Sequence, residues 1–251
     1  RQLYRGMEIG TDAISKKEQK GISHHLLGIT TPDKPITVAE YKDLALEKIE
    51  EIYKRNHIPL LVGGTGLYIS AIIDAYNIPK VKPNLKLREK LQKEAAEKGK
   101  EYVHKKLKKL DPKAAARIHP NNLRYVIRAI EVKLSKAVRT KKTTKPFDVL
   151  IIGTNRPRIE LYKRINLRVD RQIKKGLTDE VKKLVKKGYD ERLPAMTSLG
   201  VKEIIPYIKG KMPLDECVEI LKQNTRRYAK RQMTWFRRYA NVICEADNIK
   251  L

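Results

Sequence analysis

The stretch from His57 to Ile69, HIPLLVGGTGLYI, most constrains what this chain can fold into. An apolar run from Ile58 to Val62 meets a Gly-Gly-Thr-Gly turn, and apolar residues with helical spacing resume at Leu67. A short β-rich run that ends in glycines and restarts as a helix predicts a strand-turn-helix joint, the place where open α/β sheets bind their ligands. We therefore expect the active site to include this joint.

The glycines around Thr65 permit positive φ angles and expose backbone N–H groups below a helix N-terminus, which suits an anion or a tightly held polar ligand. A nucleotide-binding phosphate loop would also need a lysine after its last glycine, and none follows Gly66. An ordinary turn between a strand and a helix would carry the same residues. This stretch alone leaves both interpretations open.

The charge of the chain indicates a polyanionic partner. Its 251 residues include 56 Lys and Arg against 29 Asp and Glu, a formal net charge of +27. An excess of this size favours nucleic acid, because binding releases the counterions that surround the phosphates. The alternative is a lysine-rich surface of the kind found in heat-adapted proteins.

The rarer residues indicate a reducing compartment and no dedicated metal site. Cys217 and Cys244 show no CxxC spacing, and His24 and His25 have no Cys, Asp or Glu at ligand spacing beside them. No apolar run approaches the roughly 20 residues of a membrane span, and no signal peptide is visible. We expect a cytoplasmic protein without a membrane partner.

Periodicity divides the chain into an α/β core and a helical insertion. Thr37 and Glu40 predict a capping box that starts a helix, while Phe147–Gly153 and Val242–Glu245 read as strands. Residues 82–142 contain no strand-like run. We therefore predict an α/β fold with residues 1–81 and 143–251 as the catalytic core and residues 82–142 as an all-helical insertion.

Helix starts and basic residues further define the insertion. Its helices are expected to begin at Asn84, Glu101, Asp111 and Asn122. The last of them, Leu123–Lys136, directs Leu134 inward and sets Arg124 and Arg128 on one ridge, four residues apart. Such a pair suits phosphates, and a solvated face would show the same spacing.

Two later helices concentrate cations. Arg164, Arg168 and Arg171 follow one flank of the helix Arg158–Lys175, and a row of planar guanidinium groups suits a diphosphate. In the helix Leu214–Arg238, the segment TRRYAKRQMTWFRR interleaves basic and aromatic residues. This composition suits RNA, whose phosphates and splayed bases are both targets, although an exposed charged helix is the plainer alternative.

Together these segments resemble the tRNA dimethylallyltransferase family, also called tRNA isopentenyltransferases. RQLYRGMEIGT, GISHHLL, LVGGTGLYI, DPKAAARIHPNN, LRYVIRAIEV, TSLG and TRRYAKRQMTWFRR occur in the family's order along essentially the whole chain. The resemblance implies a core similar to P-loop NTPases with a parallel sheet, and a helical insertion that contacts tRNA. It also implies transfer of a dimethylallyl group from its diphosphate to N6 of the adenosine 3′ of the anticodon.

By motif position, the resemblance implies roles for individual residues. Arg168 matches the arginine that stabilises the leaving diphosphate, and Thr65 matches the residue that meets the tRNA beside the reaction channel. Gln2 matches the glutamine that reads the flipped base. The remaining implied tRNA-binding residues are Arg1, Arg124, Tyr125, Arg128, Lys230, Arg231, Gln232, Thr234, Trp235 and Arg237.

The resemblance further implies Mg²⁺ as cofactor, the tRNA anticodon stem-loop and dimethylallyl diphosphate as partners, and a bacterial-type monomer. The family's GxxxxGK[ST] loop and Asp-Ser pair would precede Arg1, so we expect the native N-terminus upstream and part of the active site outside this chain. Two alternatives stay open at this point: a non-catalytic RNA-binding remnant, and a transferase that acts on free adenine nucleotides.

Overall fold

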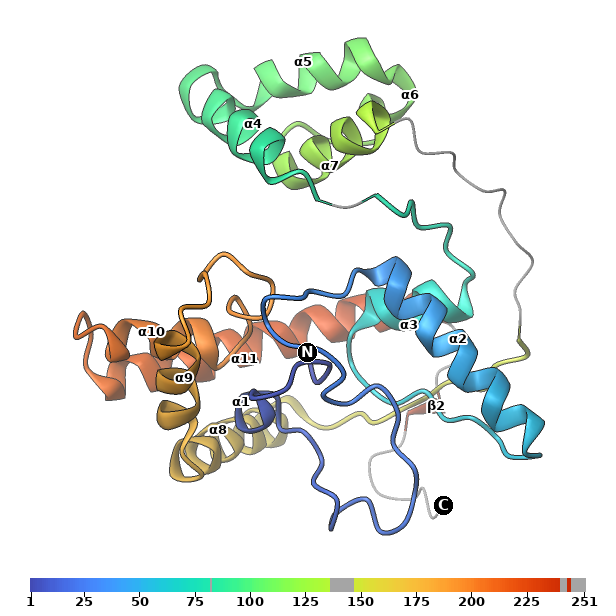
Figure 1. The fold of residues 1–251 in the computed structure, drawn as a ribbon, viewed down its shortest axis with the longest axis vertical. Coiled ribbons are helices and arrows are strands. Elements are labelled where there is room, and N and C mark those ends of the chain that lie inside the picture. Colours follow the sequence, from blue (N-terminus) through green and yellow to red (C-terminus); the bar gives the residue numbers. More distant parts are fainter. Residues whose placement is uncertain (82, 136–146, 240–242, 245–251) are drawn as a thin grey trace. The chain divides into compact units, whose positions relative to one another are not determined.

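The computed structural model describes residues 1–81, 83–135, 147–239 and 243–244, which form two compact units (Figure 1). The larger unit comprises Arg1–Ile36, Tyr41–Ile73 and Phe147–Leu251. The smaller unit comprises Thr37–Glu40 and Asp74–Pro146. Each unit has a hydrophobic core of its own.

All regular secondary structure in the described part of the smaller unit that follows residue 74 is helical. Its helices are α4 (Leu85–Lys98), α5 (Lys100–Leu110), α6 (Pro112–Ala115) and α7 (Leu123–Leu134). Their core includes Leu91, Val103, Leu107, Val126 and Ile130, each almost fully buried. Residues 82 and 136–142 of the predicted insertion lie outside the described residues.

Local capping explains where these helices begin. The Asn84 side chain accepts a hydrogen bond from the Leu87 N–H at 3.0 Å, and the Asp111 side chain accepts one from the Ala114 N–H at 2.9 Å. Both satisfy donors that the first helical turn leaves without a partner, so the two predicted starts are confirmed. The predicted inward position of Leu134 is wrong, since this residue is 52% exposed in the last turn of α7.

Helices also dominate the larger unit. Besides α2 (Val38–Lys54), which is described below, they are α1 (Glu8–Thr11), α3 (Gly66–Ile73), α8 (Arg158–Lys174), α9 (Leu177–Lys186), α10 (Val201–Ile208) and α11 (Leu214–Phe236). One core cluster joins α8 to α11 through residues such as Val169, Val181, Met196, Ile204 and Leu221. No helix in the described part of the chain is both long enough and apolar enough to span a membrane.

A second cluster in the larger unit packs α2 (Val38–Lys54) against α3. Ala45, Ile72 and Ile73 are its buried members. The predicted capping box of α2 is confirmed, because the Thr37 N–H donates to Glu40 Oε2 at 2.8 Å and the Glu40 N–H donates to Thr37 Oγ1 at 3.2 Å.

The structure does not confirm a parallel sheet core. The only named strands in the described residues are β1 (Ile152–Gly153) and β2 (Ile243–Cys244), which pair in parallel. Residues 58–62 form no strand, and Ile58 and Val62 are 84% and 89% exposed. A strand requires a paired neighbour for its backbone groups, and no described segment provides one for residues 58–62. Most of the predicted strand at residues 147–153 is likewise outside regular structure, with Leu150 72% exposed.

Candidate functional site

A single helical turn near the N-terminus positions the predicted base-reading glutamine. Gln2 donates its side-chain amide to the carbonyl of Thr11 at 3.2 Å and to that of Asp12 at 3.0 Å, at the end of α1. Asp12 closes the turn in the left-handed conformation, with φ 51°. The side chain of Gln2 is therefore fixed by the backbone of the α1 turn. Arg1 donates its guanidinium to the carbonyl of Pro194.

Arg168 lies against the same turn. Its Nε is 3.3 Å from Asp12 Oδ2, and both side chains are nearly half exposed. An open pocket of about 210 Å³ surrounds the pair, and it is lined by Asp12, Arg164, Arg168, Arg171, Gln172 and Lys175. Four cations and one carboxylate give this pocket a net positive charge, which suits a phosphate or diphosphate group.

The Gly-Gly-Thr-Gly joint packs against α11 and not against open space. Gln232 donates its amide to the Gly64 carbonyl at 2.8 Å, and Trp235 donates its indole N–H to Ser70 Oγ at 3.1 Å. A Cβ atom on Gly66 would lie 2.3 Å from the Trp235 ring. From the sequence alone, these glycines could serve either ligand binding or an ordinary turn, and the structure shows that Gly66 makes room for an aromatic side chain.

The same contacts place several predicted tRNA-binding residues together. Thr65 precedes α3, and its carbonyl accepts the Tyr68 and Ile69 N–H groups at 2.9 and 3.2 Å. Burial raises the pKa of Tyr68, Tyr4 raises it further, and the positive charge of Arg1 lowers it. Thr65, Gln232 and Trp235 therefore lie together at this joint of the larger unit.

The other predicted residues of α11 face solvent. Lys230, Arg231, Thr234 and Arg237 are exposed. The Arg231 guanidinium lies 5.6 Å from the Tyr228 ring centroid, and the Thr234 hydroxyl donates to the Lys230 carbonyl at 3.0 Å. Arg226 differs from them, because it donates to Asn166 Oδ1 at 2.7 Å and is partly buried. Arg226 belongs to the same basic segment TRRYAKRQMTWFRR, but its guanidinium lies between α8 and α11.

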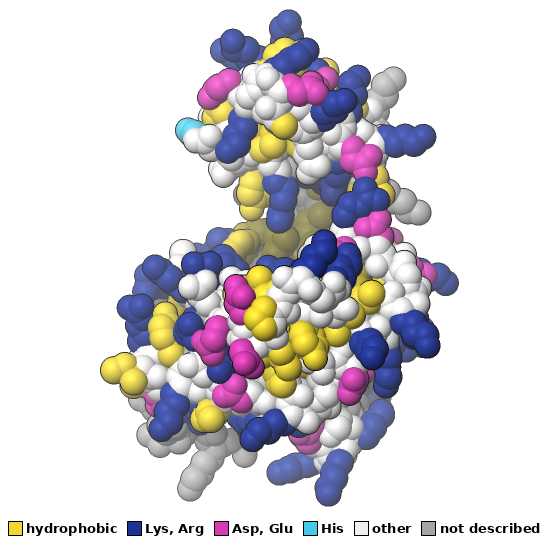
Figure 2. All heavy atoms as spheres, turned by 90° about the vertical axis from the view of Figure 1, so that its left-hand side faces the viewer, with side chains coloured by type: hydrophobic (Ala, Val, Ile, Leu, Met, Phe, Trp, Pro, Cys, Tyr) yellow, Lys and Arg dark blue, Asp and Glu magenta, His cyan; other side chains and the backbone are white. Residues whose placement is uncertain are grey.

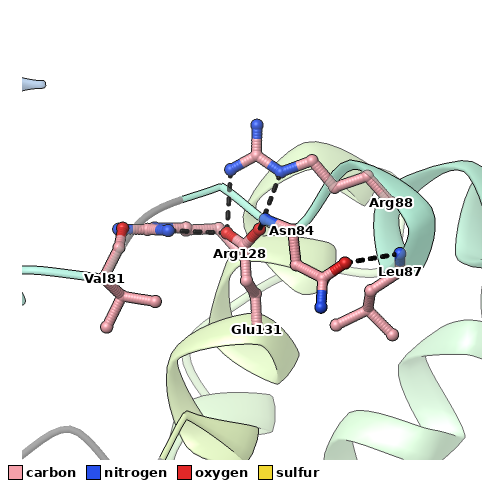
Figure 3. A network of polar contacts seen from close by, with 6 residues as sticks. All are labelled: Val81, Asn84, Leu87, Arg88, Arg128 and Glu131. Atoms are coloured by element: carbon pink, nitrogen blue, oxygen red, sulfur yellow. Dashed lines mark hydrogen bonds and ion pairs between the residues drawn. The ribbon is translucent and has the colours of Figure 1, made fainter. Parts of the chain in front are cut away.

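Arg128 takes part in a polar network within the smaller unit (Figure 3). Its Nη1 donates to Glu131 Oε2 at 2.6 Å, and its Nη2 donates to the Val81 carbonyl at 3.0 Å. Arg88 donates to both oxygens of Glu131 at 2.9 and 2.8 Å, and the Asn84 N–H donates to Oε1 at 2.6 Å. The network joins α4 to α7, so Arg128 has a structural role whether or not it also contacts tRNA.

Arg124 and Tyr125 lie on the exposed face of α7. Tyr125 is 60% exposed, and the Arg124 guanidinium lies 6.0 Å from the centre of its ring. A cation beside an aromatic ring suits a phosphate and an unstacked base. The tRNA contacts of all these residues stay predictions.

Positive charge is distributed widely over the visible faces of the units. Figure 2 shows Lys and Arg side chains across both units, mixed with acidic side chains. Among the described residues, no group of three or more His, Cys, Asp or Glu side chains could hold a metal ion. Mg²⁺ requires several oxygen ligands, and the Arg168 pocket offers one carboxylate among cations. The described residues therefore do not fit a magnesium site, and Mg²⁺ stays a prediction.

Three residues at the α1 turn were not predicted from the sequence. Asp12 closes the turn and contacts Arg168, while Gln172 and Glu180 hydrogen-bond to its backbone. A signal for Glu180 exists in the sequence, because it falls on the apolar stripe of Leu177, Val181 and Leu184. A carboxylate on the buried face of a helix needs hydrogen-bond partners from elsewhere.

With this geometry described, comparison with known proteins gives the family. A family model described as IPP transferase matches residues 2–239. The chain belongs to the IPP transferase family. Its family membership thus covers both units.

Members of the IPP transferase family with high similarity span nearly all of the chain. A tRNA dimethylallyltransferase of Alkaliphilus oremlandii is 49% identical over 247 residues, which cover 96% of this chain and 79% of that protein. Another from Acetivibrio thermocellus is 48% identical over 248 residues, with the same coverage.

Solved structures of IPP transferases share the fold. The full-length tRNA isopentenylpyrophosphate transferase from Bacillus halodurans has a TM-score of 0.70 and 44% identity, covering 97% of this chain and 78% of its own. A eukaryotic dimethylallyltransferase acting on tRNA has a TM-score of 0.77 and 26% identity, covering 97% of this chain and 64% of its own.

Proposed function

We propose that the protein transfers a dimethylallyl group from dimethylallyl diphosphate to N6 of the adenosine 3′ of the anticodon in tRNA. The observation that carries this proposal is the 49% identity, over 96% of the chain, to a protein named tRNA dimethylallyltransferase. The fold of the proposed enzyme is that of a P-loop-related core with a parallel sheet and a helical tRNA-contacting insertion at residues 82–142. A non-catalytic RNA-binding remnant is not favoured, since relatives this similar are named as enzymes.

The chemistry requires a cation near the leaving group. A bond forms between adenine N6 and the allylic carbon, the bond from that carbon to the diphosphate oxygen breaks, and N6 loses a proton. Negative charge grows on the departing diphosphate, and fixed donors aimed at that charge lower the barrier. Arg168 supplies a guanidinium in a positively charged pocket, so we assign the leaving group to this pocket.

Adenine N6 also has to be presented to the allylic carbon. The base is sheltered in the anticodon stack, so the enzyme must extrude it and hold it in place. We assign this task to Gln2, whose amide is fixed at the end of α1, and to Thr65 beside α3. The exposed residues of α7 and α11 named above would bind the tRNA backbone. A cytoplasmic location and a monomeric state belong to the same proposal.

The test is direct detection of the product. Purified full-length protein is incubated with Mg²⁺, dimethylallyl diphosphate and an anticodon stem-loop with adenosine at the target position, and the nucleosides are analysed by mass spectrometry. We expect a dimethylallyl group on N6 of that adenosine. A stem-loop with guanosine at the target position is the matched control. Absence of alkylation at saturating substrate would refute the proposal.

A further inference from the structure

The α1 turn needs support from other helices to keep its shape. It contains only four residues, and its N-terminal flank at Met7 has no side-chain cap. An isolated turn of this length is unstable, because it fixes several backbone angles for very few hydrogen bonds. Its conformation must therefore come from contacts with the rest of the larger unit.

Glu180 of α9 holds the amide side of the turn. Its two oxygens accept the N–H groups of Ile9 and Gly10, each at 2.8 Å, and the residue is only 8% exposed. A Cβ atom on Gly10 would lie 3.2 Å from Glu180 Oε1 and 3.2 Å from Leu177 Cδ1. The carboxylate thus fits closely against the glycine backbone.

Gln172 of α8 holds the carbonyl side of the same two residues. Its Nε2 donates to the Ile9 carbonyl at 2.9 Å and to the Gly10 carbonyl at 3.3 Å, and the residue is 6% exposed. Two buried side chains from different helices therefore grip one short piece of backbone. Removing either partner leaves buried polar groups without hydrogen bonds, which is costly.

The α1 turn, held by Glu180 and Gln172, contacts both Gln2 and Arg168. The carbonyls of Thr11 and Asp12 hold the Gln2 amide, and the Asp12 carboxylate contacts Arg168. Arg168 also lies one helical turn before Gln172 on α8. Any shift of the α1 turn would change the separation between the group that reads the base and the group that meets the diphosphate.

We propose that Glu180 and Gln172 are positioning residues for the transfer reaction, which act by fixing the α1 turn between Gln2 and Arg168. This inference rests on the proposed function. Glu180 does not line the pocket assigned to the diphosphate, and Gln172 lines it while its amide donates to the Ile9 and Gly10 carbonyls. We therefore expect both residues to affect the rate of the bound complex more than its formation.

The environment of Glu180 agrees with this role. Burial raises the pKa of Glu180, although the two N–H groups oppose the rise. Glu8 raises the pKa further, and Lys183 lowers it. Because each oxygen of this buried carboxylate accepts a backbone N–H of the α1 turn, its role is to hold that backbone in place.

The experiment compares Glu180→Gln and Gln172→Met with Glu203→Gln. Glu203 is a matched control, because it is 5% exposed in the same unit and accepts the Gly200 N–H at 3.0 Å and the Asn224 amide at 2.9 Å, and neither partner belongs to α1. We expect both test variants to lower kcat at least about tenfold with little change in KM for the stem-loop. The control should lose thermal stability and keep its kcat.

A double-mutant cycle then separates positioning from general stability. In an Arg168→Ala background, Glu180→Gln should lower kcat much less than in the wild-type background, because the turn acts through Arg168. Equal losses in both backgrounds, or a loss no greater than that of the folded Glu203→Gln variant, would overturn the inference. Wild-type protein without activity would instead refute the proposed function.

Discussion

Glu131 in the smaller unit and Glu180 in the larger unit are both buried, yet their surroundings differ in kind. Burial alone would raise the pKa of Glu131, but hydrogen bonds from Arg88, Arg128 and the Asn84 N–H outweigh it, and the net pKa is lowered. Burial raises the pKa of Glu180, whose hydrogen-bond donors are uncharged backbone groups. The first carboxylate neutralises cations, and the second holds a turn.

This difference decides which arginines are available to a ligand. Arg128 gives its two terminal nitrogens to Glu131 and to the Val81 carbonyl. Arg168 contacts Asp12 through Nε at 3.3 Å, and no other ion pair of Arg168 occurs within the described residues. Equal spacing along a helix therefore conceals unequal roles. One arginine stabilises its own unit, and the other faces an open pocket.

The largest expected effect is on the reaction at Arg168. Arg168→Ala removes the guanidinium from the proposed diphosphate site, and we expect kcat to fall on the order of 10²-fold or more. Single-turnover measurement of N6 alkylation, with both substrates saturating, gives the rate of the chemical step. Lys163→Ala, an exposed cation on the same helix, is the control and should keep its rate. Unchanged turnover in Arg168→Ala would remove this residue from the leaving-group role.

The second effect is on the stability of the smaller unit. Glu131→Gln keeps the shape of the side chain and leaves two arginines without their carboxylate. Because Arg88 and Arg128 are about one-third exposed, we expect a loss of about 2 kcal/mol, less than for a fully buried pair. Urea unfolding, with hydrogen exchange at α4 and α7, measures the loss. Glu94→Gln, which disrupts the more exposed pair with Lys106, should show a smaller effect; an equal effect would contradict the distinction drawn here.

Stability should depend on pH with opposite signs at the two glutamates. The folded pKa of Glu131 is below its ordinary value of 4.5, so its stabilising contribution is present above pH 4.5 and is lost as the pH falls through the folded pKa. The folded pKa of Glu180 is above 4.5, so its contribution is complete below pH 4.5 and is lost as the pH rises through the folded pKa.

Urea midpoints of the wild type, Glu131→Gln and Glu180→Gln between about pH 3 and pH 7 test this sign difference. The gap between wild type and Glu131→Gln should narrow toward acid pH. Over the same fall in pH, the stability of the wild type should increase relative to that of Glu180→Gln. Parallel pH dependences for the two variants would show that their environments do not differ as described.

The smallest effect is expected at the exposed cation of α7. Arg124→Ala should weaken stem-loop binding a few-fold and reduce the slope of log K against log salt by about one, as for the loss of one phosphate contact. Binding titrations at several salt concentrations measure both quantities. Lys133→Ala is the control, because nine residues along a helix place it on the opposite side. Equal slopes for the two variants would indicate diffuse attraction and no specific contact.

Features set by neighbours in sequence were predictable. The caps at Thr37, Asn84 and Asp111 follow from side chains that reach N–H groups only three residues away. The strands were not predictable in the same way, since residues 58–62 have strand-like composition but no described partner. Composition records a preference, while pairing depends on chain segments that are distant in sequence.

In the candidate site, too, some residues could be predicted from the sequence, whereas others depend on contacts between distant segments. Arg168 and Gln2 follow from the resemblance, and the structure brings both to the α1 turn. Gln172 and Glu180 act across three different helices, so no spacing within one helix reveals what they bind. The pairing of Arg128 with Glu131 was visible at three residues' separation, but the burial of Glu131 depends on α4.

The contact between Trp235 and Gly66 has a practical consequence. The chain contains a single tryptophan, and its indole lies against the Gly-Gly-Thr-Gly joint with its N–H on Ser70. The Arg238 guanidinium lies over the Trp235 ring, 4.0 Å from the ring centroid. Tryptophan emission from this chain, excited selectively over its 12 tyrosines, is therefore a signal from one place in the fold. The Gly-Gly-Thr-Gly joint therefore carries its own optical probe, and the proposed binding of RNA at this joint can be followed without any label.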